Sequence, residues 1–465
     1  MCAQRSEGRI PDPAELAAWD KAHVWHPFTH MRQYLAEQPL IVRRGLGTKL
    51  QDVQGNWYYD GTSSIWLNVH GHNVPELNAA IEAQLREVAH STLLGQANVP
   101  SIVLARRLVE VVPKGLNRVF YSDCGAAAVE IALKLAVQFW ANQGRREKRF
   151  ILGFVNNYHG DTMGAVGVAP DPLFHWPFLE LLPRHPRVPY PYPYRNESGD
   201  SEQCKRESLK QVEKVLQERA AELAAVIIEP VQGSGGIIPA PPGFLRELRR
   251  LCERYDVLLI VDEVATGFGR TGRLFACEAE DVVPDLLCLG KGISGGYLPL
   301  AATLATERIF EAFLGDVDEG KTFFHGHSYT GNPLGCAVAL ACLDNLLPLL
   351  PLLPARVEKL RRVLQPLAGH PYVGEVRQAG FMVGIELVAD RETKRLFPYS
   401  AQVGFVVARE ARRRGLLIRP VGSVLIFMPP VAVTEGELEE MVVILEAASE
   451  AALPEMERLA REGKA

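Results

Sequence analysis

The middle of the chain alternates short apolar runs with longer segments in which apolar residues recur about every 3.6 positions. Continuous apolar runs predict strands buried on both faces, and the periodic segments predict amphipathic helices. The predicted strands are residues 118–123, 149–155, 224–230, 257–264 and 285–291. The predicted helices are residues 126–144, 242–255 and 331–347. This alternation predicts an α/β fold with a mainly parallel sheet between two layers of helices.

The pattern changes beyond the proline-rich stretch at 348–354, where shorter strands and charged helices predict a smaller α+β domain. A chain of 465 residues is long for a single core. We therefore expect a large domain over residues 76–347 and a small domain over residues 348–465. Residues 1–75, with a hairpin around Gly55, are expected to pack with the small domain.

Composition and charge narrow the classes of partner. The chain is 47% hydrophobic and 23% charged, with a formal net charge of −5, which gives no reason to expect nucleic acid or a membrane as partner. The first twenty residues lack an apolar signal core, and the apolar run at 346–354 is short and broken by proline. Eight cysteines occur without a C-x-x-C pair, so we expect free thiols in a reducing cytoplasm.

A glycine motif follows the predicted strand at 257–264. Gly267, Gly269 and Gly272 have the G-x-G-x-x-G spacing of dinucleotide-binding loops. In such loops the first glycine follows the strand directly, and a helix opens at the last glycine. Here several residues intervene and no helical period follows, so the glycines are predicted to form a loop without a dinucleotide.

Two charged residues at strand ends are better candidates for chemistry. Asp262 closes one predicted strand, and Lys291 leaves the next one between Gly290 and Gly292. Open α/β sheets bind ligands at the carboxyl ends of their strands. Asp262 could pair with a structural arginine or hold the protonated ring nitrogen of pyridoxal phosphate. Lys291 could be a structural residue or, with its pKa lowered by desolvation, the amine that forms a Schiff base with that cofactor.

The same cofactor needs a phosphate site and a cover for its ring. Gly125 and Ala126 stand where the long predicted helix begins, and free N–H groups at a helix N-terminus can hold a phosphate. A plain capped helix start is the alternative. Tyr158, in "NNYHGDT", could cover the ring or be a core residue with a satisfied hydroxyl.

Other polar clusters are predicted to be structural. His70 and His72, like His325 and His327, imitate pairs of metal ligands, but no third ligand stands at a suitable spacing. We expect hydrogen-bonded loop histidines and no metal. The basic runs are predicted to be solvated surface at residues 145–149 and 412–414.

In combination these motifs resemble the class III (subgroup II) aminotransferases of the fold type I pyridoxal phosphate enzymes. The resemblance covers residues 20 to 450 and is carried by "NNYHGDT", "IIEPVQGSGG", "VDEVATGFGRTG", "CLGKGISGGYLPL" and "HGHSYTGNPLGCAVA". Within the family, "HVWHPFTHM", "DGTSSIWLNVHGHNVPELN" and "GLLIRPVGSVLIFMPP" resemble members that act in biotin biosynthesis. This implies conversion of 8-amino-7-oxononanoate (KAPA) to 7,8-diaminononanoate by a ping-pong mechanism. The alternative is another ω-amino-acid or diamine transaminase, or an aminomutase.

The resemblance also implies roles for single residues. Lys291 would bind the cofactor and move protons, Asp262 would keep the ring nitrogen protonated, and Tyr158 would stack on the ring. The other implied cofactor contacts are Gly125, Ala126, His159 and Glu229, together with His327 and Ser328, which reach the phosphate of the neighbouring subunit of a homodimer. The implied substrate contacts are Phe28, Trp66, Asp161 and Arg419, the last of these binding the substrate carboxylate.

Two departures from the family pattern bear on the site. Cys124 and Ala126 replace the usual hydroxyl residues of the phosphate turn, which leaves backbone contacts to hold the phosphate. Ile65, Trp66 and Phe28 stand where members that use S-adenosylmethionine carry Trp-Trp and Tyr. The small-molecule amino donor is therefore L-lysine or S-adenosylmethionine, with L-lysine favoured.

Overall fold

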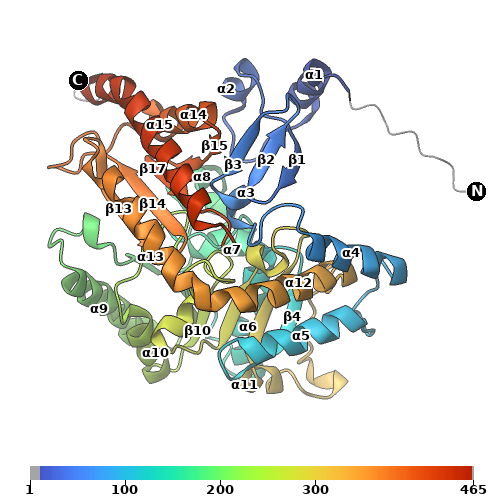
Figure 1. Ribbon diagram of the computed structural model, residues 1–465. Helices are drawn as coiled ribbons and strands as arrows, with labels where there is room; N and C mark the ends of the chain where they lie inside the picture. Colours follow the sequence, from blue (N-terminus) through green and yellow to red (C-terminus); the bar gives the residue numbers. More distant parts are fainter. Residues whose placement is uncertain (1–10, 463–465) are drawn as a thin grey trace, which may run out of the picture.

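The computed structural model describes residues 11–462, which are built around one large sheet (Figure 1). Its strands are β4 (Leu116–Ser122), β5 (Phe150–Phe154), β6 (Arg187–Val188), β7 (Leu223–Ile228), β10 (Leu258–Asp262), β11 (Leu286–Leu289) and β12 (Ala301–Thr306). They are ordered β4–β12–β11–β10–β7–β5–β6. Neighbours are parallel except at β12, which runs antiparallel to both β4 and β11.

Helices cover both faces of this sheet because its strands are apolar on both faces. On one face α6 (Gly125–Asn142) packs against Leu258 and Ile260 of β10. Leu259 and Val261 of the same strand point into the core on the opposite face. The helices of that second layer are α5 (Val99–Val111), α10 (Phe244–Arg254) and α12 (Pro333–Leu346).

The predicted mainly parallel α/β sheet is confirmed, and each predicted strand and helix of this region is present within a few residues of its expected ends. The sequence interpretation missed β12, which has the sequence AATLAT. Its small side chains lack the apolar bulk that signals a buried strand. Its antiparallel pairing is a tertiary feature, set by strands distant in sequence.

Two smaller, four-stranded sheets accompany the large sheet. One is antiparallel, with strands β13 (Val373–Ala379), β14 (Met382–Leu387), β17 (Val424–Phe427) and β16 (Arg419–Val421). It is accompanied by the helices α13 (Leu353–Val363), α14 (Val403–Arg413) and α15 (Glu435–Glu462). The other contains β1 (Val42–Leu46), β2 (Lys49–Asp52), β3 (Trp57–Asp60) and β15 (Leu416–Leu417).

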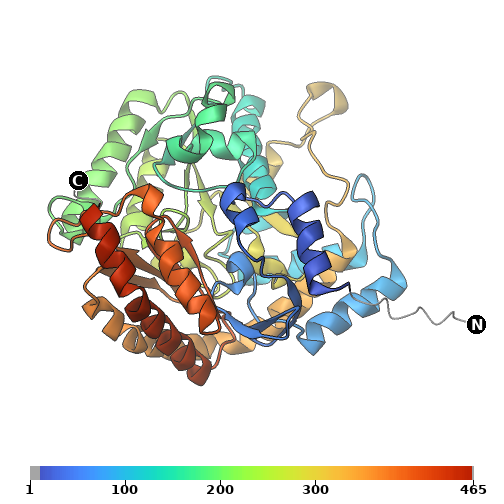
Figure 2. The same cartoon turned by 90° about the horizontal axis from the view of Figure 1, so that it is seen from above.

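The N-terminal and C-terminal segments meet in that second small sheet. The predicted hairpin is confirmed, since β2 and β3 pair antiparallel, and β3 also pairs in parallel with β15. The blue N-terminal strands accordingly lie beside the red C-terminal helices (Figures 1 and 2). The remaining elements are α1 (Pro13–His23), α2 (Met31–Ala36), α3 (Ser63–Trp66), α4 (Pro75–Glu87), α7 (Met163–Val168), α8 (Pro172–His175), α9 (Ser201–Arg219), α11 (Glu307–Glu311), β8 (Val231–Gln232) and β9 (Ile238–Pro239).

One basic run departs from its predicted place on the surface. Lys148, within residues 145–149, is only 1% exposed. Its ammonium donates to the backbone carbonyls of Ala220 at 2.9 Å, Leu223 at 3.0 Å and Asp256 at 2.6 Å. The prediction of a solvated turn is therefore wrong for this residue, which cross-links three segments in the interior.

Within residues 11–462, one helical run, Pro333–Gly369, is long and apolar enough to cross a membrane by length and composition alone. This is weak evidence, because the core helices of many proteins pass the same test. Prolines interrupt the run, and α12, its first part, buries Val338 and Leu343 in the protein. We therefore assign the run to the fold and not to a membrane.

Candidate active site

The candidate active site lies where β10, β11 and the start of α6 meet. Gly290, directly after β11, packs on Gly125, so that an added Cβ would lie 3.3 Å from Gly125 Cα. A Cβ added to Gly125 would lie 2.5 Å from Cγ1 of Val264, just after β10. Only glycine allows this close approach, which brings two strand ends and a helix N-terminus into one cradle.

Lys291 projects from this cradle without a hydrogen-bonding partner. It lies directly after Gly290, with φ 39° in the left-handed region that non-glycine residues seldom adopt. Its Nζ stands 4.7 Å from the ring centre of Trp66, and no hydrogen bond to it is formed within residues 11–462. Burial lowers the pKa of Lys291, while the charges of Asp262 and Glu229 partly oppose that shift. The amine is therefore biased toward its neutral, nucleophilic form.

Asp262 is held by a histidine. Its Oδ2 lies 2.7 Å from Nδ1 of His159, and its Oδ1 accepts the N–H of Val264 at 3.0 Å. Both side chains are buried, and Nε2 of His159 has no partner among the described residues. The alternative of a structural Asp–Arg pair is wrong. The contact fixes the orientation of the carboxylate at the strand end.

A second buried carboxylate, Glu229, follows β7. It accepts the N–H of Tyr158 at 2.8 Å and the N–H of Gly233 at 3.1 Å. Burial raises the pKa of Glu229 to about 7, with the charge of Asp262 adding to the shift. Tyr158 is half-buried, and its hydroxyl donates to Oδ2 of Asp161 at 2.8 Å. Its hydroxyl is thus satisfied at an exposed rim, not inside the core.

The start of α6 is the turn predicted to hold a phosphate. Cys124, the N-cap residue, makes no side-chain capping hydrogen bond, so the first N–H groups of the helix have no partner from that side chain. Gly160 packs on this turn, since its added Cβ would lie 2.3 Å from Cβ of Ala126. The segment that carries Tyr158 and His159 therefore lies against the first turn of α6.

Trp66 reaches the site through an unusual backbone turn. The α3 residues Ser63, Ser64, Ile65 and Trp66 all have positive φ, between 49° and 72°, so the turn is left-handed. Such backbone is costly for non-glycine residues and persists only where its surroundings hold it. The carboxylate of Asp60 accepts both the N–H and the hydroxyl of Ser64, and the hydroxyl of Ser63 donates to a carbonyl in the C-terminal part.

The remaining candidate residues form two groups away from the lysine. Phe28 is 60% exposed, and its carbonyl accepts a hydrogen bond from Nη2 of Arg419 at 2.9 Å. Nδ1 of His327 lies 2.8 Å from Oδ2 of Asp123, and Ser328 is exposed. Phe28 and Arg419 thus lie together, as do His327 and Asp123. Within residues 11–462, no hydrogen bond or ion pair joins either group to Lys291. Asp123 was missed from the sequence, although it directly precedes the phosphate turn.

The first histidine pair is hydrogen-bonded as predicted. Nε2 of His70 lies 2.8 Å from the carbonyl of Cys342, and Nε2 of His72 lies 2.9 Å from Oδ2 of Asp60. His72 therefore joins the carboxylate that supports the left-handed turn before Trp66. This role has no local sequence signal, because it depends on a backbone conformation that the sequence pattern does not predict.

Comparison with known families decides the class of protein. The family model for aminotransferase class-III matches residues 32–448. The chain belongs to the class-III aminotransferases. The predictions of an aminotransferase and of the fold type I architecture are confirmed.

Relatives and solved structures of class-III aminotransferases cover nearly the whole chain. It is 48% identical to the adenosylmethionine-8-amino-7-oxononanoate aminotransferase of Aquifex aeolicus, over 93% of this chain and 96% of that protein. The structure of the enzyme of the same name from Methanocaldococcus jannaschii superimposes with a TM-score of 0.90 at 42% identity, covering 95% of this chain and 99% of that one. An (S)-enantioselective omega-transaminase from Thermomicrobium roseum also gives 0.90, at 36% identity, covering 96% and 100%.

Proposed function

We propose that this class-III aminotransferase uses pyridoxal phosphate to convert KAPA to 7,8-diaminononanoate in biotin biosynthesis. The observation that carries the proposal is the unpartnered amine of Lys291 beside Trp66 and two buried carboxylates. The substrate is inferred from relatives at 48–50% identity, which are named for amino transfer to 8-amino-7-oxononanoate. The similarity to an omega-transaminase keeps a different amine and ketone as the second candidate.

The residues present fit pyridoxal phosphate. The cofactor supplies an aldehyde that reacts with amines and a ring that withdraws electrons from the reacting carbon. Lys291 offers an amine whose pKa is lowered by burial, and Asp262 offers a fixed carboxylate for a protonated ring nitrogen. The uncapped start of α6 offers the N–H groups of Gly125 and Ala126 to a phosphate without requiring hydroxyl side chains.

In the reaction, each side chain has a separate task. Lys291 would hold the cofactor until an incoming amine takes its place, and its freed amine would then move a proton between the substrate carbon and the cofactor. Asp262 keeps the ring nitrogen protonated, and His159 holds that carboxylate in place. Tyr158 covers the ring and is fixed by Glu229 at its backbone and by Asp161 at its hydroxyl.

Substrate recognition is assigned to the rim of the site. Trp66 and Phe28 supply apolar surface for the carbon chain of KAPA, and Asp161 borders Tyr158. Arg419 uses one N–H on the carbonyl of Phe28, and its planar guanidinium carries further donors for the substrate carboxylate. Partial burial lowers the pKa of Arg419.

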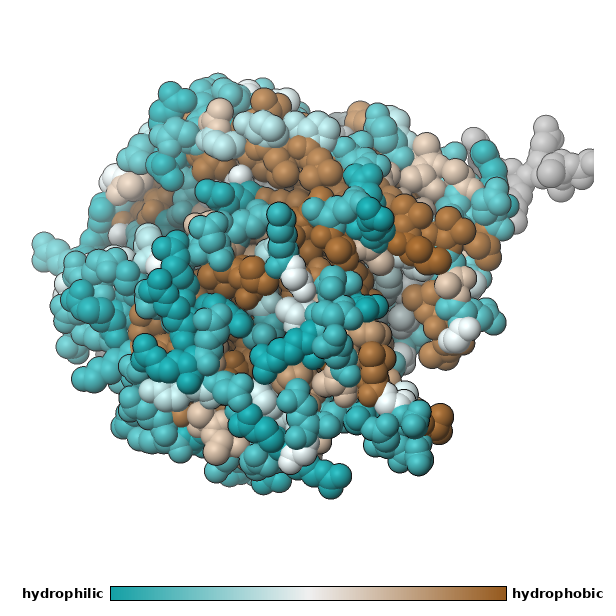
Figure 3. Space-filling view, turned by 90° about the horizontal axis from the view of Figure 1, so that it is seen from below, coloured by the Kyte–Doolittle hydropathy of each residue, from teal (hydrophilic) through white to brown (hydrophobic). Residues whose placement is uncertain are grey.

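We also assign the chain to a cytoplasmic homodimer. Exposed apolar side chains gather on the segments before α5 and α12, including Leu94 (72% exposed), Phe324 (86%) and Tyr329 (62%). The ring of Tyr329 lies 5.0 Å from that of His90, which joins the two segments into one surface. Figure 2 shows the segment between α11 and α12 projecting from the body, and Figure 3 shows an apolar band across one face. Large exposed apolar surfaces mark protein interfaces.

A second copy of the chain is the proposed partner for this surface. The same projecting segment carries His327 and Ser328, which would then serve the phosphate site of the other subunit. Phe324→Asp is expected to produce monomers in light scattering and to reduce activity, whereas a monodisperse wild-type monomer with full activity would contradict the assignment.

The amino donor is proposed to be L-lysine, on the sequence around Ile65, Trp66 and Phe28. The relatives' names instead specify adenosylmethionine. The deciding experiment is the absorption spectrum of the protein loaded with pyridoxal phosphate, before and after separate additions of the two donors. Loss of the visible band with one of them, and its return with KAPA, identifies donor and acceptor. Loss with neither moves the proposal to another transaminase, and no band in loaded protein overturns the cofactor.

A further inference from the structure

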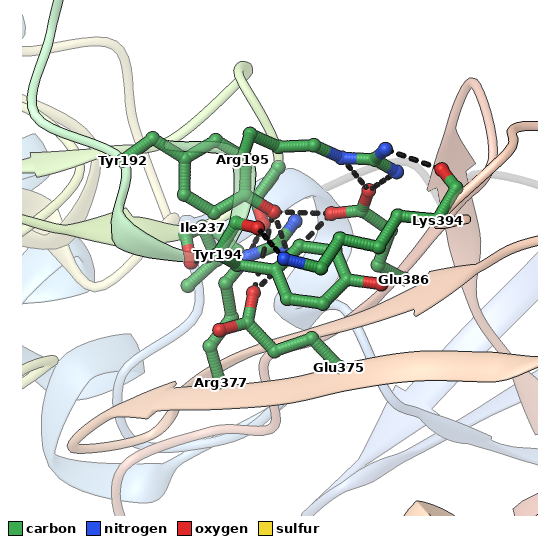
Figure 4. A network of polar contacts seen from close by, with 9 residues as sticks. Tyr192, Tyr194, Arg195, Ile237, Glu375, Arg377, Glu386 and Lys394 are labelled. Atoms are coloured by element: carbon green, nitrogen blue, oxygen red, sulfur yellow. Dashed lines mark hydrogen bonds and ion pairs between the residues drawn. The ribbon is translucent and has the colours of Figure 1, made fainter. Parts of the chain in front are cut away.

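A buried network of charged residues joins the two small strands β13 and β14 to the large-sheet part of the chain (Figure 4). At its centre, Nη1 of Arg377 donates to Oε2 of Glu386 at 2.6 Å, with side chains only 6% and 5% exposed. Tyr192 and Arg195, from the segment after β6, also bond to Glu386. Although burial opposes its ionisation, Arg377 holds the pKa of Glu386 below its usual range.

Arg377 also contacts the turn between β8 and β9. Its Nε donates to the carbonyls of Gly236, at 2.8 Å, and Ile237, at 3.0 Å, in the turn between β8 and β9. The turn lies tightly against β14, because a Cβ added to Gly384 would lie 2.3 Å from the carbonyl oxygen of Gly236. One guanidinium therefore holds both an ion pair between β13 and β14 and the backbone of this turn.

The other end of the same turn supports the active site. The carbonyl of Gly233 accepts the N–H groups of Gly236 and Ile237, each at 3.0 Å, which closes the turn. The N–H of Gly233 donates to Glu229, and a Cβ added to Gly233 would lie 3.0 Å from the ring of Trp66. Hydrogen bonds and close packing thus connect Gly236, through Gly233, to the carboxylate of Glu229 and the indole of Trp66.

Apolar packing runs along the same path. Trp66, Ile237, Met382 and Val424 belong to one buried cluster, so the indole beside Lys291 and the strands that carry Arg377 share a core. Packed cores transmit small displacements because they contain few voids.

We propose that Arg377 is a positioning residue for amino transfer: by holding the carbonyls of Gly236 and Ile237 it sets the positions of Glu229 and Trp66 in the site. The inference rests on the proposed function only in taking the Lys291 pocket as the place of reaction. A lysine at this position keeps a positive charge for Glu386 but lacks the separate Nε–H group with which Arg377 binds the carbonyls of Gly236 and Ile237.

The test compares Arg377→Lys with Arg195→Lys in enzyme loaded with pyridoxal phosphate. Both variants weaken the contacts of Glu386, but Arg195 does not touch the turn between β8 and β9. Arg377→Lys is expected to lower kcat of the donor half-reaction roughly tenfold. It is also expected to shift the pH midpoint of the cofactor's visible absorption, recorded without substrate. Arg195→Lys should leave both within twofold of wild type.

If Arg377→Lys and Arg195→Lys gave the same midpoint in the absorption titration, the proposal would be overturned. Arg377 would then serve only to connect β13 and β14 to the large-sheet part of the chain. Because this titration needs no substrate, it remains decisive if KAPA proves not to be the acceptor. If Arg377→Lys does not fold, Gly384→Ala provides the second test, since its methyl group would lie 2.3 Å from the carbonyl oxygen of Gly236 and 3.2 Å from Nε of Arg377 and so disturbs this contact without removing the arginine. The same shift in the titration midpoint is expected. An unshifted midpoint in folded Gly384→Ala would contradict the proposed connection from this turn to Glu229 and Trp66.

Discussion

Two lysines of this chain have amine groups inside the protein, and they are held in opposite ways. Lys148 is closed in, and its ammonium donates to three backbone carbonyls from two separate segments. Lys291 is only partly buried, and its amine faces the ring of Trp66 with no hydrogen bond in residues 11–462. Burial lowers the pKa of both, that of Lys148 to about 8.

The difference shows that a lowered pKa does not by itself identify a reactive amine. A lysine whose donors are all used is fixed in the structure, because moving it would expose unsatisfied carbonyls. A lysine with unused donors beside an opening is free to exchange one partner for another. In this chain the geometry of the donors, together with the adjoining carboxylates, separates the structural lysine from the reactive one.

The largest expected effect comes from removing the free amine. Lys291→Met should lower amino transfer by at least about 10³-fold, because the proton shuttle and the cofactor attachment are both lost. The same change should leave the thermal midpoint of the cofactor-free protein unchanged or raised, since an unsatisfied polar group leaves the interior. Turnover with saturating donor and calorimetry measure the two effects. A substantial residual rate in cofactor-loaded Lys291→Met would refute the assignment.

For Lys148 we expect the opposite result, a loss of stability without a loss of activity. Lys148→Met fills a similar volume but removes the lysine donor from three carbonyls, of which that of Ala220 keeps a backbone N–H donor, so the free energy of unfolding should fall by about 3 kcal/mol. Turnover per folded active site should stay near wild type. Urea denaturation measures the loss, with the exposed Lys210→Met as control, for which a change below about 0.5 kcal/mol is expected. Unaltered stability in Lys148→Met would show that the carbonyl contacts contribute little.

These two lysines also show how far the sequence allows prediction. Asp262 and Lys291 could be found because each follows a continuous apolar run, and strand ends of a parallel sheet converge. Lys148 was misassigned because a run of charges normally indicates solvent. Its burial depends on carbonyls of Ala220 and Asp256, which are more than seventy positions away. The left-handed turn before Trp66 was missed for the same reason, since Asp60, His72 and a C-terminal carbonyl are assembled only by the tertiary fold.

The raised pKa of Glu229, in the candidate active site, can be tested by measuring how the stability of the protein depends on pH. Its pKa is raised from 4.5 to about 7, so the folded protein binds a proton that the unfolded chain releases between these values. Its contribution to stability is therefore fully present below pH 4.5 and is lost as the pH rises through 7, by about 3 kcal/mol at most. Glu229→Gln should flatten this loss in cofactor-free protein.

Denaturant unfolding at pH 5 and pH 8 measures the slope for Glu229. The exposed Glu218→Gln serves as the control and should keep the wild-type slope. A Glu229→Gln protein that loses as much stability as wild type between the two pH values would contradict the raised pKa. The site charge would then have to be stabilised by a group other than the two N–H donors seen here.

The smallest expected effect concerns Trp66, whose ring lies beside the amine of Lys291. The face of Trp66, 4.7 Å from Nζ, favours the ammonium form of Lys291 by cation–π attraction of about 1 kcal/mol. Trp66→Phe weakens this attraction, so the pKa of Lys291 should fall slightly further. Cofactor capture by the cofactor-free protein should then reach its maximum at a lower pH, because the neutral amine is the reacting form. The exposed Trp25→Phe is the matched control, being 88% exposed. An unchanged pH profile in Trp66→Phe would mean that burial alone sets the reactivity of Lys291, and the indole would then serve the substrate only.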